Sequence, residues 1–361
     1  MIDFWGHFSG PGSYVVVCRA IAKELYKHFG DRLRIGNLRA SYPDQLVDIT
    51  HSSDEDVGYV HCCASYDVKN LTAIPGVGLL FGFPNWLKNI PRYTTTVGYH
   101  VCDLNRIPPH WTSAMNTWAT HIVTPSSWCA ETFDSCGVHW KDISVVHHGV
   151  CAELLAEQCV EPSTSQFVFD HYCSSQVPDR KGTLELIDAF VLCASKMPDA
   201  VLRIHTSSPA VLARVAQART ARIVVEQECF VSDVDQAARY QQAHVVVQPS
   251  RCEGFGMIPL EALSVGTPVI TTACTGHAEW ASSLGGGAFI ISSGELGECQ
   301  PGPGLAPSVK TDHIVQALQY AFNKYDTLRK EAIEFQEHVR EVWSWSNVLQ
   351  PLVSLLSELG A

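Results

Sequence analysis

The sequence is short of charge, and of positive charge in particular. Of its 361 residues 17% are charged, and 25 Lys and Arg stand against 37 Asp and Glu, for a formal net charge of −12. Binding nucleic acid or an anionic lipid surface over a broad face requires many phosphates to be neutralised, so this balance argues against it. It still allows a local basic pocket. With 46% hydrophobic residues the composition is that of a folded globular protein.

Three further patterns are absent. The 14 cysteines include no C-x-x-C pair and no His/Cys cluster at zinc spacing, so neither a structural zinc site nor a redox dithiol is indicated. The first residues lack the basic and apolar regions of a secretory signal, so we expect reduced, mostly buried thiols. The longest apolar stretch, near residues 74–86, is about thirteen residues with Pro and Gly inside it, too short to span a bilayer. We therefore expect a cytoplasmic protein without a transmembrane segment, and leave peripheral membrane attachment open.

Short β-branched runs alternate with helical stretches along the chain, a pattern typical of parallel sheets covered by helices. At about 150 residues per domain the length favours two domains. Residues 159–166 carry Pro, Ser and Thr without periodicity, which predicts a linker. We predict an α/β protein with Rossmann-like domains at 1–160 and 161–340, and a helix at 341–361 that packs back on the first domain.

The predicted elements follow from the same pattern. Strands are expected at 32–37, 57–62, 77–81, 94–101, 120–123, 143–146, 167–172, 201–205, 222–225 and 244–247. Helices are expected at 14–29, 127–136, 183–194, 210–218, 233–242, 311–325, 328–343 and 346–359, and residues 294–307, rich in Gly and Pro, are expected to be a loop. Ligands of such folds bind where loops leave the strand ends and enter helix N-termini.

The strongest motif follows the strand at 244–247. Gly254 and Gly256 let the backbone approach a ligand closely, and Pro259 suits the first turn of a helix. Glu253 and Glu261, eight positions apart, flank this turn and could accept hydrogen bonds from sugar hydroxyls while N–H groups face a phosphate. The simpler alternative is that Glu261 only favours the helix dipole.

Together with Gly266-Thr267-Pro268, this segment resembles the hallmark of family 4 retaining glycosyltransferases of the GT-B fold, two Glu separated by seven residues. Other segments resemble the same family in order and spacing from about residue 6 to 345. They are Gly10-Pro11-Gly12-Ser13, Asn105-Arg106-Ile107-Pro108-Pro109-His110-Trp111, Thr124-Pro125-Ser126-Ser127-Trp128, His147-His148-Gly149 and Asp179-Arg180-Lys181-Gly182-Thr183.

The resemblance implies two Rossmann-like domains facing a central cleft and a nucleotide-diphosphate sugar as donor. It implies that Glu253 contacts the donor sugar and Glu261 the ribose, and that Lys181 neutralises the diphosphate, with Arg180 either sharing this role or facing solvent. Two further backbone segments would lie near the sugar and diphosphate. They are the N–H groups around Gly254, Phe255, Gly256 and Met257, and the loop at Gly12. No metal or cofactor is implied.

One departure concerns the phosphate clamp. The family usually has an Arg five or six positions before the Lys, where this sequence has Gln176 and Ser175. Either the clamp is weaker, which raises the question of impaired activity, or another residue such as Arg251 supplies the charge.

The residues that would bind the acceptor are harder to identify from the sequence. His100 and Asp103 end the strand at 94–101, where the family often places a residue that orients the acceptor hydroxyl or binds the donor sugar. A structural histidine is the alternative, and in enzymes that retain anomeric configuration the leaving phosphate itself can take the acceptor's proton. The Gly10-Pro11-Gly12 run is not a dinucleotide fingerprint, because Val15 stands where the third Gly would be.

Three hypotheses follow. The first is a metal-independent retaining glycosyltransferase that acts on a glycan, lipid or small-molecule acceptor. The second is a nucleotide-sugar-binding protein with weak or lost turnover, and the third is a glycosyltransferase that acts on a modified base in DNA. The third is weakened by the overall charge, although residues 1–150 carry only 11 − 13 = −2 of it.

Overall fold

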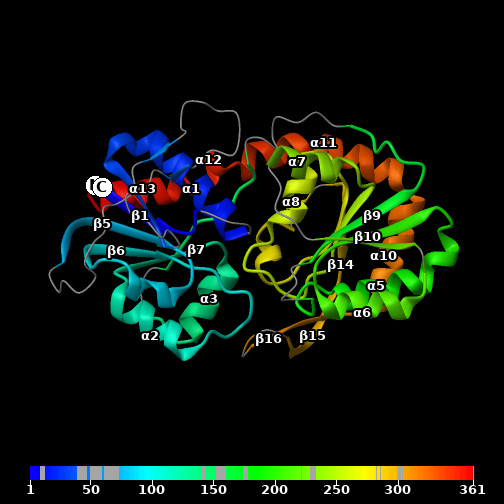
Figure 1. Cartoon of the computed structure of the whole chain (residues 1–361), viewed down its shortest axis with the longest axis horizontal. Helices are drawn as coiled ribbons and strands as arrows, with labels where there is room; N and C mark the ends of the chain where they lie inside the picture. Colours follow the sequence, from blue (N-terminus) through cyan, green and yellow to red (C-terminus); the bar gives the residue numbers. More distant parts are fainter. Residues whose placement is uncertain are drawn as a thin grey trace. The chain divides into compact units, whose positions relative to one another are not determined.

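The computed structural model describes residues 1–8, 13–38, 47–48, 59–60, 73–139, 143–151, 160–173, 178–220, 222–227, 233–281, 283–284, 286–299, 302 and 304–360. The chain divides into two compact units, which Figure 1 colours along the sequence. Unit 1 consists of Met1–Cys102, Arg106–Gly149 and Trp345–Ala361, and unit 2 of Asp103–Asn105 and Val150–Ser344. The three residues Asp103–Asn105 thus belong to unit 2, although their neighbours on both sides belong to unit 1.

Unit 1 is built on a sheet of six parallel strands in the order β2-β1-β5-β6-β7-β8. The strands are β1 (Ile2–Gly6), β2 (Leu33–Asn37), β5 (Ile74–Phe81), β6 (Tyr93–Tyr99), β7 (His121–Thr124) and β8 (Ile143–Val145). Its helices are α1 (Ser13–Phe29), α2 (Pro109–Trp118), α3 (Ser127–Ser135), α12 (Trp345–Val348) and α13 (Gln350–Glu358), with 3-10 turns η1 (Gly30–Arg32) and η3 (Pro84–Asn89). Residues 345–358 thus group with unit 1, where α12 contacts α1.

The strands of unit 1 differ from the prediction in two places. β1 was missed because Asp3 interrupts its apolar run; the buried carboxylate is neutralised by Arg34 on β2, at 2.6 Å, and accepts the Tyr93 hydroxyl at 2.8 Å. Of the strand predicted at 57–62, the described part is β4 (Tyr59–Val60), which pairs antiparallel with β3 (Val47–Asp48) and does not join the six-stranded sheet.

Unit 2 repeats the architecture with the strand order β11-β10-β9-β12-β13-β14, all parallel. The strands are β9 (Phe167–Tyr172), β10 (Ala200–His205), β11 (Ile223–Glu226), β12 (Val245–Gln248), β13 (Val269–Thr272) and β14 (Ala288–Ile291). Its helices are α5 (Thr183–Cys193), α6 (Pro209–Ala218), α7 (Asp233–Gln241), α8 (Met257–Ser264), α9 (Ala278–Ala281), α10 (Thr311–Asn323) and α11 (Tyr325–Trp343), with η4 (Ala194–Lys196) and η5 (Thr275–His277). The prediction of two Rossmann-like units with parallel sheets is confirmed.

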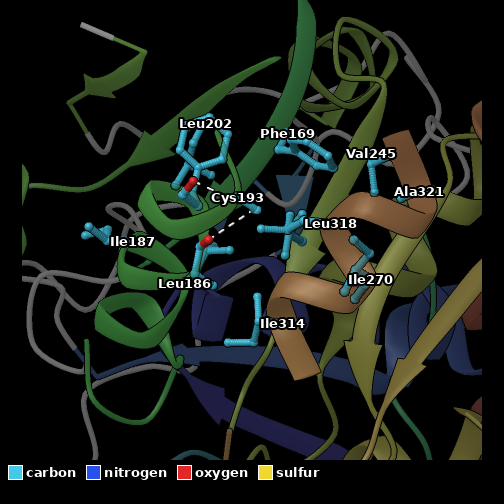
Figure 2. Packing of buried hydrophobic residues seen from close by; sticks show 14 of the residues in the cluster. Phe169, Leu186, Ile187, Cys193, Leu202, Val245, Ile270, Ile314, Leu318 and Ala321 are labelled. Carbon is cyan, nitrogen blue, oxygen red and sulfur yellow. Dashed lines mark hydrogen bonds between the residues drawn. The ribbon is translucent and has the colours of Figure 1, made fainter. Parts of the chain in front are cut away.

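The core of unit 2 lies between the sheet and helices α5 and α10 (Figure 2). Phe169, Leu202 and Val245 from three neighbouring strands meet Leu186 of α5 and Leu318 of α10, all fully buried. The central strands are buried on both faces, because α5, α6 and α10 cover one side of the sheet and α7, α8 and α11 the other. This core fixes the strand ends from which the site loops leave.

The loop predicted at 294–307 was also wrong. β15 (Ser293–Glu298) and β16 (Leu305–Val309) pair as an antiparallel hairpin, with Pro307 opposite Leu296. Both strands of a two-stranded sheet are edge strands, where Gly and Pro are tolerated. Composition alone therefore cannot distinguish such a hairpin from a loop.

All cysteines in the described part of the chain are free thiols, and all of these except Cys136 are buried. Among the described helices, none combines the length and apolar character that a bilayer crossing demands.

Candidate functional site

The best-defined polar site lies at the carboxyl ends of β9 and β12 in unit 2. The strand order reverses between these two strands, and ligands of doubly wound sheets bind at such a switch point. The chain leaves β9 toward Arg180 and Lys181 at the start of α5, and leaves β12 toward Glu253. The topology therefore brings together residues that are 72 and 73 positions apart in the sequence.

Glu253 is the centre of the site. Its side chain is 9% exposed, and its Oε2 accepts a hydrogen bond from Arg180 Nη1 at 2.7 Å. Its Oε1 accepts from Lys181 Nζ at 2.5 Å and from the Ser250 hydroxyl at 2.8 Å. Both oxygens of this buried carboxylate are thus bound, which fixes its orientation.

These charges set the protonation of the site. Burial alone would raise the pKa of Glu253, but the charges of Arg180 and Lys181 outweigh burial and hold this pKa well below its usual range. Burial opposes the charge of Arg180 as well, yet Asp103 and Glu253 raise the pKa of its guanidinium above the ordinary value. The site is therefore a buried carboxylate between two cations at neutral pH.

The loops after β9 and β12 pack tightly against each other. Gly182 has a φ of +65°, and a Cβ there would lie 2.3 Å from the Pro249 carbonyl oxygen. The Arg251 amide donates to the Arg180 carbonyl at 2.8 Å. Glycine is required at position 182 both by its conformation and by this approach of two backbones. This close packing of the two loops positions Lys181 next to Glu253.

The glycine turn after Glu253 is held by η5. The Glu253 amide donates to the Thr275 hydroxyl at 2.9 Å, and its carbonyl accepts the Gly276 amide at 2.8 Å. Gly256 has a φ of +80°, and a Cβ there would come within 2.1 Å of the His277 ring. Burial lowers the pKa of His277 to about 4, so the ring is neutral at pH 7.

Glu261 lies in α8, behind the turn. Pro259 is the third residue of the helix, as expected for its first turn, while Glu261 is the fifth and lies one position beyond that turn. Its Oε2 accepts the Tyr240 hydroxyl of α7 at 2.7 Å, and the side chains of both residues are buried. Glu261 is therefore anchored through a partner 21 residues away in sequence.

The remaining motif residues have distinct places. Phe255 is buried, and its carbonyl accepts the Trp280 indole N–H at 3.0 Å. Met257 begins α8. Gly12, Ser175 and Gln176 lie outside the described residues.

Arg251, the alternative source of charge for the phosphate clamp, pairs with Asp179 and with two backbone carbonyls. Its Nη1 pairs with Asp179 at 2.6 Å, and its Nη2 and Nε donate to the carbonyls of Glu298 and Pro307 at 2.8 and 3.2 Å. The guanidinium ties the loop after β12 to the β15–β16 hairpin.

The two residues predicted on the acceptor side, His100 and Asp103, belong to different units. Asp103 belongs to unit 2, where its Oδ1 accepts the Gly254 amide at 2.9 Å and lies 3.3 Å from Arg180 Nη1. His100 belongs to unit 1 and is fully buried, with Nδ1 2.7 Å from the Gly82 carbonyl oxygen. Burial lowers the pKa of His100 to about 4. Its Nε2 has no hydrogen-bond partner among the described residues.

Sequence reasoning did not single out Ser250, Thr275 or Tyr240. Ser250 lies within the motif itself and could have been noticed as a hydroxyl three positions before Glu253. The other two have no signal in the sequence, because they reach the site through α7 and η5. In the part of the chain that the structure describes, no group of three or more His, Cys, Asp or Glu side chains could hold a metal ion.

Comparison with known proteins identifies proteins similar to the segment that holds this site. Residues 171–294 match the family model described as glycosyl transferases group 1. This segment, which holds the site, is therefore similar to group 1 glycosyl transferases. Two curated relatives are D-inositol 3-phosphate glycosyltransferases. The one from Pseudarthrobacter chlorophenolicus is 28% identical over 170 residues, covering 43% of this chain and 40% of the relative. The one from Corynebacterium urealyticum is 31% identical over 120 residues, covering 33% and 24%.

The chain thus spans less than half of the length of these relatives. Among solved structures, Anabaena HepE in complex with UDP-glucose superposes with a TM-score of 0.67 at 15% identity, covering 99% of both chains. That similarity, with the two six-stranded parallel sheets, identifies the fold as the two-domain α/β GT-B fold.

Proposed function

We propose that the protein is a metal-independent retaining glycosyltransferase, which transfers a sugar from a nucleotide-diphosphate donor to an acceptor hydroxyl. The observation that carries the proposal is the Glu253 carboxylate bound by Arg180 and Lys181, at the switch point of the sheet and inside the group 1 match. Because HepE has been solved in complex with UDP-glucose, UDP-glucose is the first donor to test.

The cations supply the electrostatic part of the reaction. As the bond between the anomeric carbon and the diphosphate breaks, negative charge grows on the leaving phosphate. Lys181 and Arg180 are already held in place by Glu253 and need little reorganisation to meet that charge. The leaving phosphate takes the proton of the acceptor hydroxyl on the same face of the sugar, which retains the anomeric configuration.

The two carboxylates bind the neutral parts of the donor. Glu253 accepts hydrogen bonds from sugar hydroxyls, and Glu261, anchored by Tyr240, accepts them from the ribose diol. Gly254, Phe255, Gly256 and Met257 bring backbone N–H groups to the sugar and diphosphate. Gly12 would face the donor phosphates, and His100 orients the acceptor hydroxyl or the donor sugar.

Donor turnover with Lys181→Ala and Glu253→Gln tests this assignment. We expect Lys181→Ala to lower kcat by about 10²–10³-fold, because it removes a preorganised charge from the leaving group. Glu253→Gln should weaken binding of the nucleotide sugar more than that of the bare nucleotide, because Glu253 contacts the sugar. Lys196→Ala, an exposed lysine of the same unit, is the matched control.

Full activity in both site variants would refute the site assignment. NMR of the product's anomeric proton decides between retention and inversion, and a panel of glycan, lipid, small-molecule and modified-DNA acceptors decides the acceptor class. Nucleotide-sugar binding with no turnover on any acceptor would favour the binding-protein alternative. That alternative is motivated by Ser175 and Gln176, and by the engagement of Arg251 with Asp179 and the hairpin.

A further inference from the structure

The segment Asp103–Asn105 attaches to the site of unit 2 through three successive residues. Asp103 accepts the Gly254 amide at 2.9 Å. Leu104 is buried in a small cluster with Cys252, Cys299 and Ala306. Asn105 Oδ1 accepts the amide of Leu305, at the start of β16, at 2.7 Å. The attachments of Leu104 and Asn105 fix the backbone here independently of the Asp103 carboxylate.

Asp103 contacts two groups that, in the proposed function, bind the diphosphate of the nucleotide sugar. One is an N–H of the glycine turn, and the other is the Arg180 guanidinium, 3.3 Å away. Arg180 already pairs with Glu253, so a second carboxylate on it is not needed to neutralise it. The Asp103 side chain is 40% exposed against 9% for Glu253, so it can rotate into solvent, whereas Glu253 cannot.

We propose that Asp103 is a resident anion of the donor site, which the diphosphate of the nucleotide sugar displaces from Gly254 and Arg180. This inference rests on the proposed function. Only the Asp103 side chain needs to rotate, because Leu104 and Asn105 hold the backbone. Asp103 is then a residue that tunes donor affinity, since each binding event must overcome its charge.

The test compares Asp103→Asn with the wild type by calorimetry, with UDP and with inorganic pyrophosphate as probes. Asn keeps an acceptor for the Gly254 amide and removes only the charge. We expect the Kd of both probes to fall by about fivefold at low salt, and the difference to shrink toward 0.5 M salt as the charges are screened. Asp188→Asn is the matched control, because Asp188 is an Arg-paired carboxylate of 38% exposure on α5.

An Asp103→Asn variant that binds both probes no more tightly than the wild type, with an unchanged melting temperature, would overturn the proposal. So would an equal gain in Asp188→Asn, because the effect would then follow net charge alone. Tighter binding of pyrophosphate without any binding of UDP or other nucleotides would support the displaced anion and refute the nucleotide-sugar donor.

Discussion

At the residue scale, the site is defined by a buried charge that is fully paired. A buried carboxylate costs several kcal/mol unless cations and hydrogen-bond donors surround it. Glu253 meets this condition with Arg180, Lys181 and Ser250. Removal of one partner leaves the buried charges of the site incompletely paired. We therefore expect each of these residues to affect the site as a whole.

Tyr240 acts in the same way on Glu261. We expect Tyr240→Phe to lower stability by about 1–3 kcal/mol, because a buried carboxylate oxygen loses its donor. The Kd for UDP should rise, while the kcat at saturating donor stays close to that of the wild type. Urea unfolding and calorimetry measure the two effects, with Tyr320→Phe, at an exposed position, as the control. Unchanged UDP affinity would show that Tyr240 does not position Glu261 for the ribose.

At the scale of elements, the loop between β12 and α8 takes its shape from contacts outside itself. η5 binds the backbone of Glu253, and Arg251 ties the loop to the β15–β16 hairpin. The sequence motif therefore predicts a glycine turn here, whereas the position of the turn depends on segments up to 56 residues further along the chain.

Substituting Gly256 tests this dependence. Gly256→Ala should cost about 1–2 kcal/mol for the positive φ, and a further 1–3 kcal/mol or so for the contact with His277. Gly137→Ala is the matched control, because Gly137 has a φ of +81° with nothing within 4 Å of the added Cβ. Differential scanning calorimetry measures both variants. Equal destabilisation would show that His277 moves aside freely.

Individual elements also show where sequence patterns fail. The helices with a clear apolar stripe, such as α1 and α10, appear where the pattern predicts them. β1 was missed because the charge of Asp3 is neutralised by a residue on another strand. The β15–β16 hairpin was missed because only its cross-strand partners make a strand of a Gly- and Pro-containing segment.

At the scale of the whole molecule, both units bury neutral histidines. Burial lowers the pKa of His100 to about 4 and of His148 to about 3 in unit 1, and of His171 and His277 to about 4 in unit 2. Between these values and the ordinary pKa near 6.5, the unfolded chain binds more protons than the folded chain. Stability therefore falls as the pH decreases through this window.

We expect the melting temperature to decrease steadily from pH 7 to pH 4.5, before the paired carboxylates Glu253 and Asp170 are protonated. Their lowered pKa values stabilise the fold above the ordinary carboxyl pKa, and that contribution is lost only at lower pH. His277→Gln should reduce the pH dependence of the melting temperature of unit 2, whereas substitution of the exposed His338 in the same unit should not. A melting temperature that does not change between pH 7 and 5 would contradict the prediction.

The sequence by itself determined the α/β class, the two parallel sheets and the segment around Glu253 and Glu261. These features depend on the hydrophobic periodicity of the chain and on the conformational preferences of residues that are close together in the sequence. The tertiary structure alone decided that Arg180, Lys181 and Ser250 share one carboxylate, that Tyr240 anchors Glu261, and that Asp103 lies on Gly254. Those contacts join residues from 3 to 151 positions apart. Arg180 and Lys181 reach Glu253 because the strand order reverses between β9 and β12, which brings the loops after these two strands together.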